Sequence, residues 1–421
     1  MKVLSNLEDR GFMRTLFTNA TIIDCVSPEP RFGNILVEDG VIREIGPRAS
    51  SSVECETIDV KGRTVMPGLI DCHVHVVASM MNLAMNAQLP APLAVFRSAR
   101  IMKGMLERGF TTVRDLGGAS CALAEAVAQG LTPGPRLIVC GKALSKTGGH
   151  SDCRPRHDIH DGNRWAGNVG SLGRLADGVE EVRKACRLEL RSGASFIKVM
   201  ANGGVASPTD PIAWLGYSED ELKAAVDEAR DAKTYVAAHL YTAEGITRAV
   251  KCGVHSLEHC NLVDRHAAQL AAQAKAVAVP TLVTYEALAQ DGPALGLPAS
   301  SVAKIEDVRR AGIESLSILR DAGVPIAFGT DLLGETHVRQ SEEFTIRSQV
   351  LPAIEILASA TTVAARLIGM EGRLGVVAEG AIADLLIVDG APLDDIRILS
   401  DPAKNLRLVM KQGVIQSRNS L

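Results

Sequence analysis

Short apolar runs rich in β-branched residues recur through the central part of the chain and alternate with longer segments of helical character. Eight such runs are found, at residues 66–75, 111–116, 136–141, 195–201, 235–241, 254–259, 276–283 and 325–331. The intervening segment 218–233 opens with Ser218 and has acidic residues in its first turn, as helix capping and the helix dipole favour. Eight strands that alternate with helices predict a (β/α)8 barrel, an α/β fold. A doubly wound sheet is the alternative, although no GxGxxG motif follows the first run.

The two ends of the chain have a different pattern. Residues from about 15 to 65 and from about 372 to 417 consist of strand-like segments separated by turn signals such as Asp-Gly and Lys-Gly. Neither end is long enough to bury a good core alone. We therefore expect residues 1–65 and 372–421 to pair into one small composite β-sandwich, and residues 66–371 to form the barrel. Two unrelated β appendages are the alternative.

Composition and charge narrow the class of protein. The chain has 45 Lys and Arg residues against 49 Asp and Glu residues, and only 3% aromatic residues, which disfavours a protein dedicated to nucleic acid. No uninterrupted apolar stretch approaches the length of a membrane span, and the N-terminus, which carries acidic residues and lacks a continuous apolar core, does not resemble a secretory signal. The nine cysteines are scattered without a CxxC pair, which indicates mostly buried thiols in a reducing compartment. We expect a cytoplasmic protein.

Polar side chains end or interrupt five of the apolar runs. They are His73 and His75 in the first run, Lys198 in the fourth, His239 in the fifth, His259 in the sixth and Asp331 in the eighth. Because side chains alternate along a strand, His73 and His75 point to the same side. In a barrel, such groups converge at the C-terminal ends of the strands. Four imidazoles, one carboxylate and one lysine together suit a transition metal with nitrogen and oxygen ligands.

The lysine needs a special role at a metal site. A neutral lysine amine reacts with carbon dioxide to give a carbamate, and burial of Lys198 favours the neutral amine. Such a carbamate can bridge two metal ions; a lysine paired with a buried carboxylate is the alternative. Asp331 would then ligate one metal and act as general base toward a metal-bridging water, before passing the proton to the leaving amine. This pattern indicates hydrolysis at a carbonyl or phosphoryl centre, and no GxSxG or GxxxxGK motif supports another chemistry.

These motifs resemble the amidohydrolase superfamily. The resemblance rests on PGLIDCHVH, the strand lysine, AAHLY, SLEHC and FGTD, and it extends from VEDGVIREIG to GAIADLLIVDG, over nearly the whole chain. It implies a (β/α)8 barrel beside a composite β-sandwich and two divalent metal ions, usually Zn²⁺. One metal would bind His73, His75 and Asp331, the other His239 and His259, and a carboxylated Lys198 would bridge them.

Further segments resemble the branch of metal-dependent dipeptidases related to imidazolonepropionase. They are TTVRDLGG, ALSKTGGH, KVMANGGVASPTDP, GYSEDEL and PTLVTYEAL. The resemblance implies cleavage of Xaa-Pro dipeptides, of other Xaa–amino acid or N-acyl amino acid bonds, or of ochratoxin-type amides, through a metal-bridging hydroxide with Asp331 as general acid and base. The alternatives are a cyclic amide, imidazolone, urea, carbamate or lactone as substrate, or a barrel that serves as a structural or binding subunit. Relatives of this kind are often homo-oligomers, which we also expect here.

Groups that contact a small-molecule substrate are expected near the metals. Tyr241, two residues beyond His239, is assigned to the substrate carbonyl oxygen, and His150 to a substrate carboxylate or carbonyl. The long loop after the third run supplies Arg154 and Arg156 as candidate partners of an α-carboxylate. Residues expected to line the pocket are Gly204, whose bare backbone permits close approach, with Val205, Ala206 and Ser207. Arg114 and Asp115 are interpreted as a structural ion pair. A core tyrosine, a loop histidine and surface arginines are the alternatives.

Overall fold

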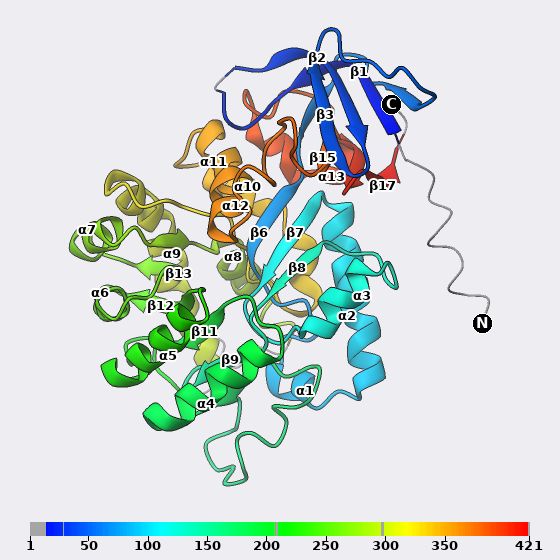
Figure 1. The fold of residues 1–421 in the computed structure, drawn as a ribbon. Coiled ribbons are helices and arrows are strands. Elements are labelled where there is room, and N and C mark those ends of the chain that lie inside the picture. The colour runs from blue at the N-terminus through cyan, green and yellow to red at the C-terminus, as the bar shows by residue number, and fades with distance from the viewer. Residues whose placement is uncertain (1–13, 28, 206, 208, 296–298, 420–421) are drawn as a thin grey trace, which may run out of the picture. The chain divides into compact units, whose positions relative to one another are not determined.

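The computed structural model describes residues 14–27, 29–205, 207, 209–295 and 299–419 (Figure 1). The first 13 residues, on which the expectation about a secretory signal rests, lie outside this part, and so does Ala206. The chain forms two compact units. One combines Met1–Ile70, Leu106–Thr111 and Ala353–Leu421, and the other combines Asp71–Met105 and Thr112–Pro352.

The larger unit is built from parallel strands. A three-stranded sheet has the order β6-β7-β8, with β6 at Leu69–Val74, β7 at Phe110–Asp115 and β8 at Arg136–Val139. A six-stranded sheet has the order β10-β9-β11-β12-β13-β14, and all its pairs are parallel. Its strands are β9 (Ala143–Ser145), β10 (Gly173–Leu175), β11 (Ile197–Met200), β12 (Val236–Thr242), β13 (Ser256–Leu262) and β14 (Val277–Val279).

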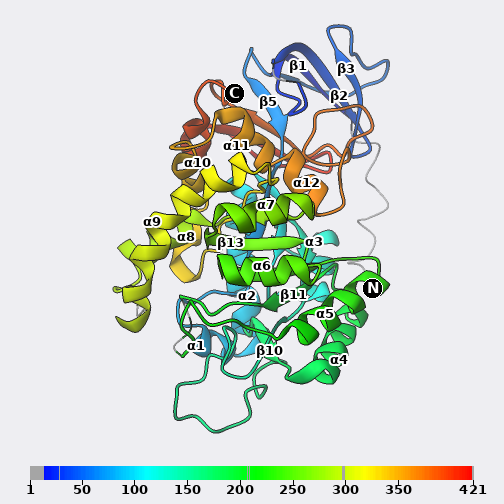
Figure 2. The same ribbon diagram turned by 90° about the vertical axis from the view of Figure 1, so that its left-hand side faces the viewer.

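Helices alternate with these strands. They are α1 (Leu83–Ala87), α2 (Ala91–Glu107), α3 (Cys121–Ala128), α4 (Gly178–Arg191), α5 (Glu219–Asp231), α6 (Ala243–Lys251), α7 (Arg265–Gln273), α8 (Leu282–Gln290), α9 (Ala299–Asp321), α10 (Glu342–Arg347) and the 3-10 helix η2 (Gly334–Arg339). Helix α5 begins as the sequence predicts, because Ser218 and Glu221 form a capping box at its start. Figure 2 shows α6 and α7 alongside β13. Val199, Ala238 and Leu257 share one buried core with residues of these helices.

The eighth predicted strand is not a regular strand in the structure. Within residues 325–331 only Ile326 forms a parallel bridge, to Ala278, and the Cys72 amide donates to the Phe328 carbonyl at 2.8 Å. Gly329 packs closely, since a Cβ there would lie 2.9 Å from the His73 Cβ, and Asp331 has a φ of 53°. These features interrupt a regular ladder. The described strands therefore form an α/β fold with two parallel sheets, and not one continuous closed barrel.

The run at residues 276–283 also differs from its prediction. Strand β14 ends at Val279, and helix α8 begins at Leu282. Pro280 separates the two elements and cannot donate a backbone hydrogen bond to a sheet. Only the first half of this run is therefore a strand.

The smaller unit combines both ends of the chain in one sheet. Its strands are β1 (Arg14–Ile22), β2 (Arg31–Glu38), β3 (Val41–Gly46), β4 (Glu56–Asp59), β5 (Thr64–Pro67), β15 (Leu385–Val388), β16 (Leu406–Lys411) and β17 (Val414–Arg418), in the order β17-β16-β15-β5-β1-β2-β3 with β4 on β1. It also contains α11 (Ala353–Ser359), α12 (Thr362–Leu367), η3 (Ile396–Ser400) and α13 (Pro402–Asn405). Ile35, Val65, Leu385 and Leu408 belong to a single core. A two-layered sandwich with limits at residues 65 and 372 stays a prediction.

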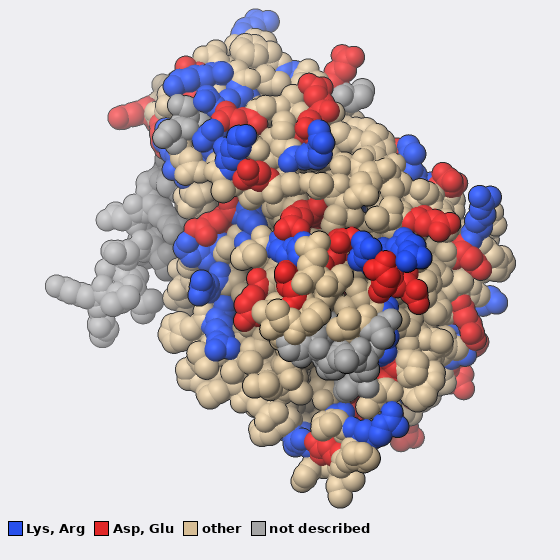
Figure 3. Space-filling view, turned by 180° about the vertical axis from the view of Figure 1, so that it is seen from behind, with Lys and Arg blue, Asp and Glu red and all other residues tan. Residues whose placement is uncertain are grey.

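The cysteines and the charged side chains are distributed as the composition suggests, with mostly buried thiols and mixed surface charge. All nine cysteines are free thiols, and six of them are buried. On the face drawn in Figure 3, basic and acidic side chains are interspersed. None of the helices in the described ranges has the length and apolar content of a membrane span.

A buried ion pair holds the segment that leads to Asp331. Arg347 and Glu343 are both fully buried and lie 2.7 Å apart, and Arg347 also donates to the carbonyls of Pro280 and Ala327. We predict that Glu343→Ala lowers the free energy of unfolding by about 3–5 kcal/mol, because it leaves the Arg347 charge buried without its partner. Urea denaturation measures this loss.

The adjacent Glu342 provides the control. It pairs with Arg339 but is 46% exposed, so Glu342→Ala should cost about 1 kcal/mol or less. Equal losses for the two variants would show that burial does not determine the contribution of this pair.

Candidate active site

The six groups predicted from strand ends meet in one cavity of about 150 Å³. They are His73 in β6, His75 directly after β6, Lys198 in β11, His239 in β12, His259 in β13, and Asp331 in the segment after Phe328. On β11 the expected alternation holds, since Val199 packs in the core while Lys198 and Met200 line the cavity. Five of the six side chains are buried, and Asp331 is 21% exposed.

His73, His75 and Asp331 form a compact ligand set. The Asp331 Oδ1 lies 3.2 Å from the His75 Nε2 and 3.5 Å from the His73 Nε2. One ligand atom from each of these three residues lies within 4.8 Å of the others. The ring of His259 lies 4.8 Å from that of His73 and 4.6 Å from that of His239, which connects the remaining imidazoles to this set.

Each imidazole uses one ring nitrogen within the protein. The pairs are His73 Nδ1 with Glu258 Oε2 at 2.8 Å, His75 Nδ1 with the Gly117 carbonyl at 3.0 Å, His239 Nε2 with the Gly203 carbonyl at 3.2 Å, and His259 Nδ1 with Thr281 Oγ1 at 2.8 Å. Carbonyls and carboxylates accept hydrogen bonds, so the first three nitrogens carry the proton. The other nitrogen of the His73 and His239 rings then carries the lone pair, as in histidines that ligate metals, and the Nε2 of His75 lies 3.2 Å from Asp331 Oδ1. This donor set fits divalent cations.

Burial keeps most of these rings neutral. It lowers the pKa of His73 and His239 well below the ordinary value and that of His259 to about 3. Burial also acts to lower the pKa of His75, but the hydrogen bond and charge of Asp331 outweigh it and raise that pKa. For Asp331, burial raises the pKa, and the neighbouring histidines reverse the effect and lower it. The site thus contains an ionised carboxylate that pairs with His75, beside three imidazoles that burial keeps neutral.

Lys198 is buried without a partner. It is 1% exposed, and burial lowers its pKa. Among the described residues, no hydrogen bond and no ion pair within 4.0 Å is found for the Lys198 Nζ, and Glu258 and Asp331 act on it only through their charge. The alternative of a directly paired lysine is therefore not found, and an amine in this state fits the neutral form that carboxylation requires.

Glu258 is a site residue that the sequence pattern missed. It is fully buried, and it accepts from His73 at one oxygen and from Arg114 and Ser256 at the other, at 2.9 and 2.6 Å. Alternation along β13 predicts opposite directions for Glu258 and His259. The backbone departs from a regular strand at His259 and Cys260, whose φ angles are 71° and 60°, and both side chains serve the same centre. The only signal in the sequence is a charged residue inside an apolar run.

The predicted ion pair of Arg114 with Asp115 is wrong. Arg114 pairs with Glu258. Asp115 accepts the backbone amides of Val76, Gly117 and Ala119. Adjacent residues on a strand point in opposite directions, which explains the separation.

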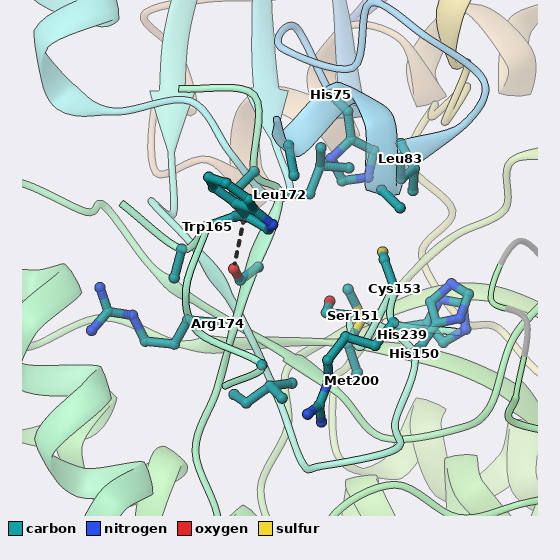
Figure 4. Close-up of a pocket in the computed structure, with 18 of the residues that line it drawn as sticks. His75, Leu83, His150, Ser151, Cys153, Trp165, Leu172, Arg174, Met200 and His239 are labelled. Carbon is teal, nitrogen blue, oxygen red and sulfur yellow. Dashed lines mark hydrogen bonds between the residues drawn. The ribbon is translucent and has the colours of Figure 1, made fainter. Parts of the chain in front are cut away.

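His150 and Tyr241 both lie against the metal-ligand set. The His150 ring stacks on His239 with centroids 4.1 Å apart, and Figure 4 shows the two rings side by side at the cavity. His150 Nδ1 contacts Ser207 Oγ at 2.8 Å. The Tyr241 ring lies 4.9 Å from His239 and 5.4 Å from His259. Its hydroxyl accepts a hydrogen bond from Tyr285 at 2.9 Å, and Tyr241 is a buried core residue that is not among those lining the cavity.

The other predicted substrate residues are placed less favourably. Arg154 lines the cavity, but its guanidinium makes two bonds to Asp152 and one to the His160 carbonyl. Arg156 is exposed and is not among the residues that line the cavity.

The predicted pocket residues Gly204, Val205 and Ser207 support His150 and Tyr241. A Cβ on Gly204 would lie 1.9 Å from the His150 ring, so the bare backbone accommodates that ring and not a ligand. Val205 packs in one core cluster with Tyr241, and Ser207 is the hydrogen-bond partner of His150. Among the described residues, none of these three lines the cavity itself.

Comparison with known proteins agrees with this geometry. The model of the amidohydrolase family matches residues 64–415. A prolidase crystallised with N-methylphosphonate-L-proline is 50% identical, with a TM-score of 0.95 over 97% of this chain and 100% of that chain. Ochratoxinase from Aspergillus niger is 34% identical over 365 residues, 83% of this chain and 75% of that protein, and its crystal structure gives a TM-score of 0.85 over 98% of this chain and 97% of that chain.

A third relative has a different activity. Imidazolonepropionase from Methylobacterium nodulans is 28% identical over 401 residues, 89% of this chain and 93% of that protein. The relatives thus match the branch that the sequence motifs resemble. The chain belongs to the amidohydrolase family and is a hydrolase that acts on amide C–N bonds.

Proposed function

We propose that the protein is a metal-dependent amidohydrolase of dipeptides and N-acyl amino acids, with Xaa-Pro dipeptides as its main substrates. The observation that carries this proposal is the four-imidazole, one-lysine, one-aspartate site in a chain 50% identical to a prolidase that binds a proline phosphonate. Similarity to ochratoxinase supports N-acyl amino acids as additional substrates.

Two divalent ions, Zn²⁺ in our proposal, suit the donor set. His73, His75 and Asp331 would hold one ion, His239 and His259 the other, and Lys198 carboxylated by carbon dioxide would bridge them. Ions bound here would polarise the scissile carbonyl and lower the pKa of water. The free imidazole nitrogens and the unpaired Lys198 are the features of this chain that support the assignment.

The other steps, proton transfer and substrate binding, are assigned to side chains of this protein. Asp331 is ionised beside His73 and His75, so it accepts a proton at its carboxylate and returns it to the leaving amine. Tyr241 receives a hydrogen bond from Tyr285 and directs its own proton to the substrate carbonyl oxygen. His150 binds the carboxylate or carbonyl of the substrate, and Ser207 and Gly204 fix its ring. Arg154 and Arg156 remain candidates for the carboxylate.

We also propose that the two parallel sheets belong to one (β/α)8 barrel. Residues 326–328 hydrogen-bond to Ala278 on one side and to Cys72 on the other. The Ser195 amide donates to the Val139 carbonyl at 2.7 Å, which connects the two sheets at the other side. These bonds support closure, which places all strand ends at one mouth.

A substrate panel tests the proposed activity. The zinc-loaded enzyme is assayed with Xaa-Pro dipeptides, Xaa-Arg dipeptides, N-acyl amino acids and an ochratoxin-type amide, and released amino acid is measured. We expect the highest kcat/KM for Xaa-Pro. Release from none of these amides, with turnover of a cyclic amide, urea or lactone, would overturn the proposal.

Substitution of the metal ligands separates binding from chemistry. His73→Ala and Lys198→Ala should lose bound zinc together with activity. Tyr241→Phe should keep the zinc of the wild type while kcat falls about 10²–10³-fold, because it removes only a donor to the developing oxyanion. Zinc content is measured by mass spectrometry of the purified enzyme. Full activity in Lys198→Ala would refute the bridging role.

Glu258 should tune metal affinity through His73. Replacement of the carboxylate in Glu258→Gln weakens the acceptor of the His73 Nδ1 proton, so we expect zinc affinity to fall about 10–100-fold. Competition with a chelator measures the affinity, and circular dichroism checks the fold. Glu244→Gln on the exposed side of α6 is the control. Unchanged zinc affinity in Glu258→Gln would show that this contact does not support the centre.

A further inference from the structure

A half-buried cation, Lys142, lies outside the metal-ligand set, between β8 and β9. Its Nζ donates to three backbone carbonyls, those of Asn168 at 2.9 Å, Ser171 at 2.5 Å and Gly118 at 3.4 Å. Burial lowers the pKa of Lys142 to about 8, with Glu189 and Asp115 opposing the effect, so the ammonium remains mostly charged at neutral pH. An ammonium with three carbonyl acceptors cross-links the segments that carry them.

The carbonyls belong to two segments with different roles. Gly118 follows β7 and belongs to the scaffold of parallel strands. Asn168 and Ser171 belong to the wall segment, residues 166–175, from which six residues line the cavity. These six are Ala166, Ser171, Leu172, Gly173, Arg174 and Leu175. Lys142 therefore connects the wall of the cavity to the ends of the strands.

Glu189 on α4 reinforces the same connection. Its Oε2 accepts the Lys142 backbone amide at 3.1 Å, and its Oε1 lies 3.2 Å from the Nε of Arg174 in the wall segment. Gly141 permits this approach, because a Cβ there would lie 2.1 Å from the Glu189 carboxylate. Directly after Lys142, strand β9 pairs with strand β10 of the wall segment.

The wall segment is also tied to helix α1. Asn86 donates to the Gly170 carbonyl at 2.7 Å, and Asn168 donates to the Ala87 carbonyl at 2.9 Å. Residues of α1 and of the position after it line the same cavity, namely Leu83, Ala84, Ala87 and Gln88. The wall segment and α1 are thus held to each other by hydrogen bonds, and Lys142 connects the wall segment to Gly118 at the end of β7.

We propose that Lys142 is a positioning residue that sets the fit of the substrate through the wall segment and leaves the metal centre unaffected. The inference rests on the proposed function, since it takes the cavity as the substrate site. Lys142 contacts no metal ligand among the described residues, so its loss should change substrate binding more than the chemical step. Without the ammonium, these three carbonyls lose their donor, and the wall segment should open more often.

Four variants test this role. Lys142→Met keeps the aliphatic chain and removes the donors, Lys142→Gln shortens it and keeps a polar end, and Lys142→Arg keeps the cation. Lys184→Met, at an exposed position of α4, is the control. Steady-state kinetics use the best amide of the panel, zinc is quantified per chain, and hydrogen–deuterium exchange mass spectrometry follows residues 166–175.

For Lys142→Met we expect KM to rise about tenfold or more, kcat to stay within about threefold, and zinc content to equal that of the wild type. Exchange should become faster in residues 166–175 and stay unchanged in α5. Lys142→Arg should recover most of the lost KM, and Lys184→Met should behave as the wild type.

Two results would overturn the role of Lys142. One is unchanged exchange and unchanged KM in Lys142→Met, and the other is a parallel loss of kcat and zinc. If Lys142→Met does not fold, Lys142→Gln is judged by the same exchange and zinc measurements. If no amide is hydrolysed, the proposed function fails, while exchange and zinc content still decide whether Lys142 holds the wall.

Discussion

The site depends on one requirement, which is that each imidazole buried at a strand end must have its hydrogen-bonding needs met by the protein. Such a ring is stable in an apolar interior only if its N–H has an acceptor, and it binds a cation only if its other nitrogen is free. Glu258 and the carbonyls of Gly117 and Gly203 supply the acceptors here, and Thr281 contacts the fourth ring. The backbone at the ends of the strands therefore selects the nitrogen that each ring presents to the cavity.

The buried charges around the imidazoles must also be balanced. Glu258 carries a buried negative charge beside His73, and Arg114 neutralises it through a 2.9 Å contact supported by Ser256 and Tyr235. Lys198 has no comparable partner among the described groups, although Glu258 and Asp331 act on it through their charge. The interior thus pairs Glu258 with Arg114, and in the proposed function divalent cations and a carbamate on Lys198 would balance the remaining charges of the site.

The sequence could reveal the strand ends because alternation and apolar runs are local properties. The positions of His73, Lys198, His239 and His259 follow from them, and so does the capping box of α5. Glu258 could not be found, because the positive φ angles at His259 and Cys260 depend on tertiary packing and reverse the expected direction. The same holds for the segment before Asp331, where close packing of Gly329 on His73 replaces regular pairing. The hydrogen bonds from Arg154 to Asp152 could not be predicted either, because they depend on the conformation of the loop.

The cavity has two kinds of support, and they have different consequences. Its inner part is held by parallel strands, whose geometry fixes the ligands through many backbone hydrogen bonds. Its wall at residues 166–175 is held by the pairing of β10 with β9 at one end and, before β10, by side-chain contacts from Lys142 and Asn86 to single carbonyls. If the protein has the proposed function, substitutions in the wall would change which acyl group or leaving amino acid fits without a change in the ligand set. Relatives as different as a prolidase and ochratoxinase are compatible with this division, since both keep the fold while their named substrates differ.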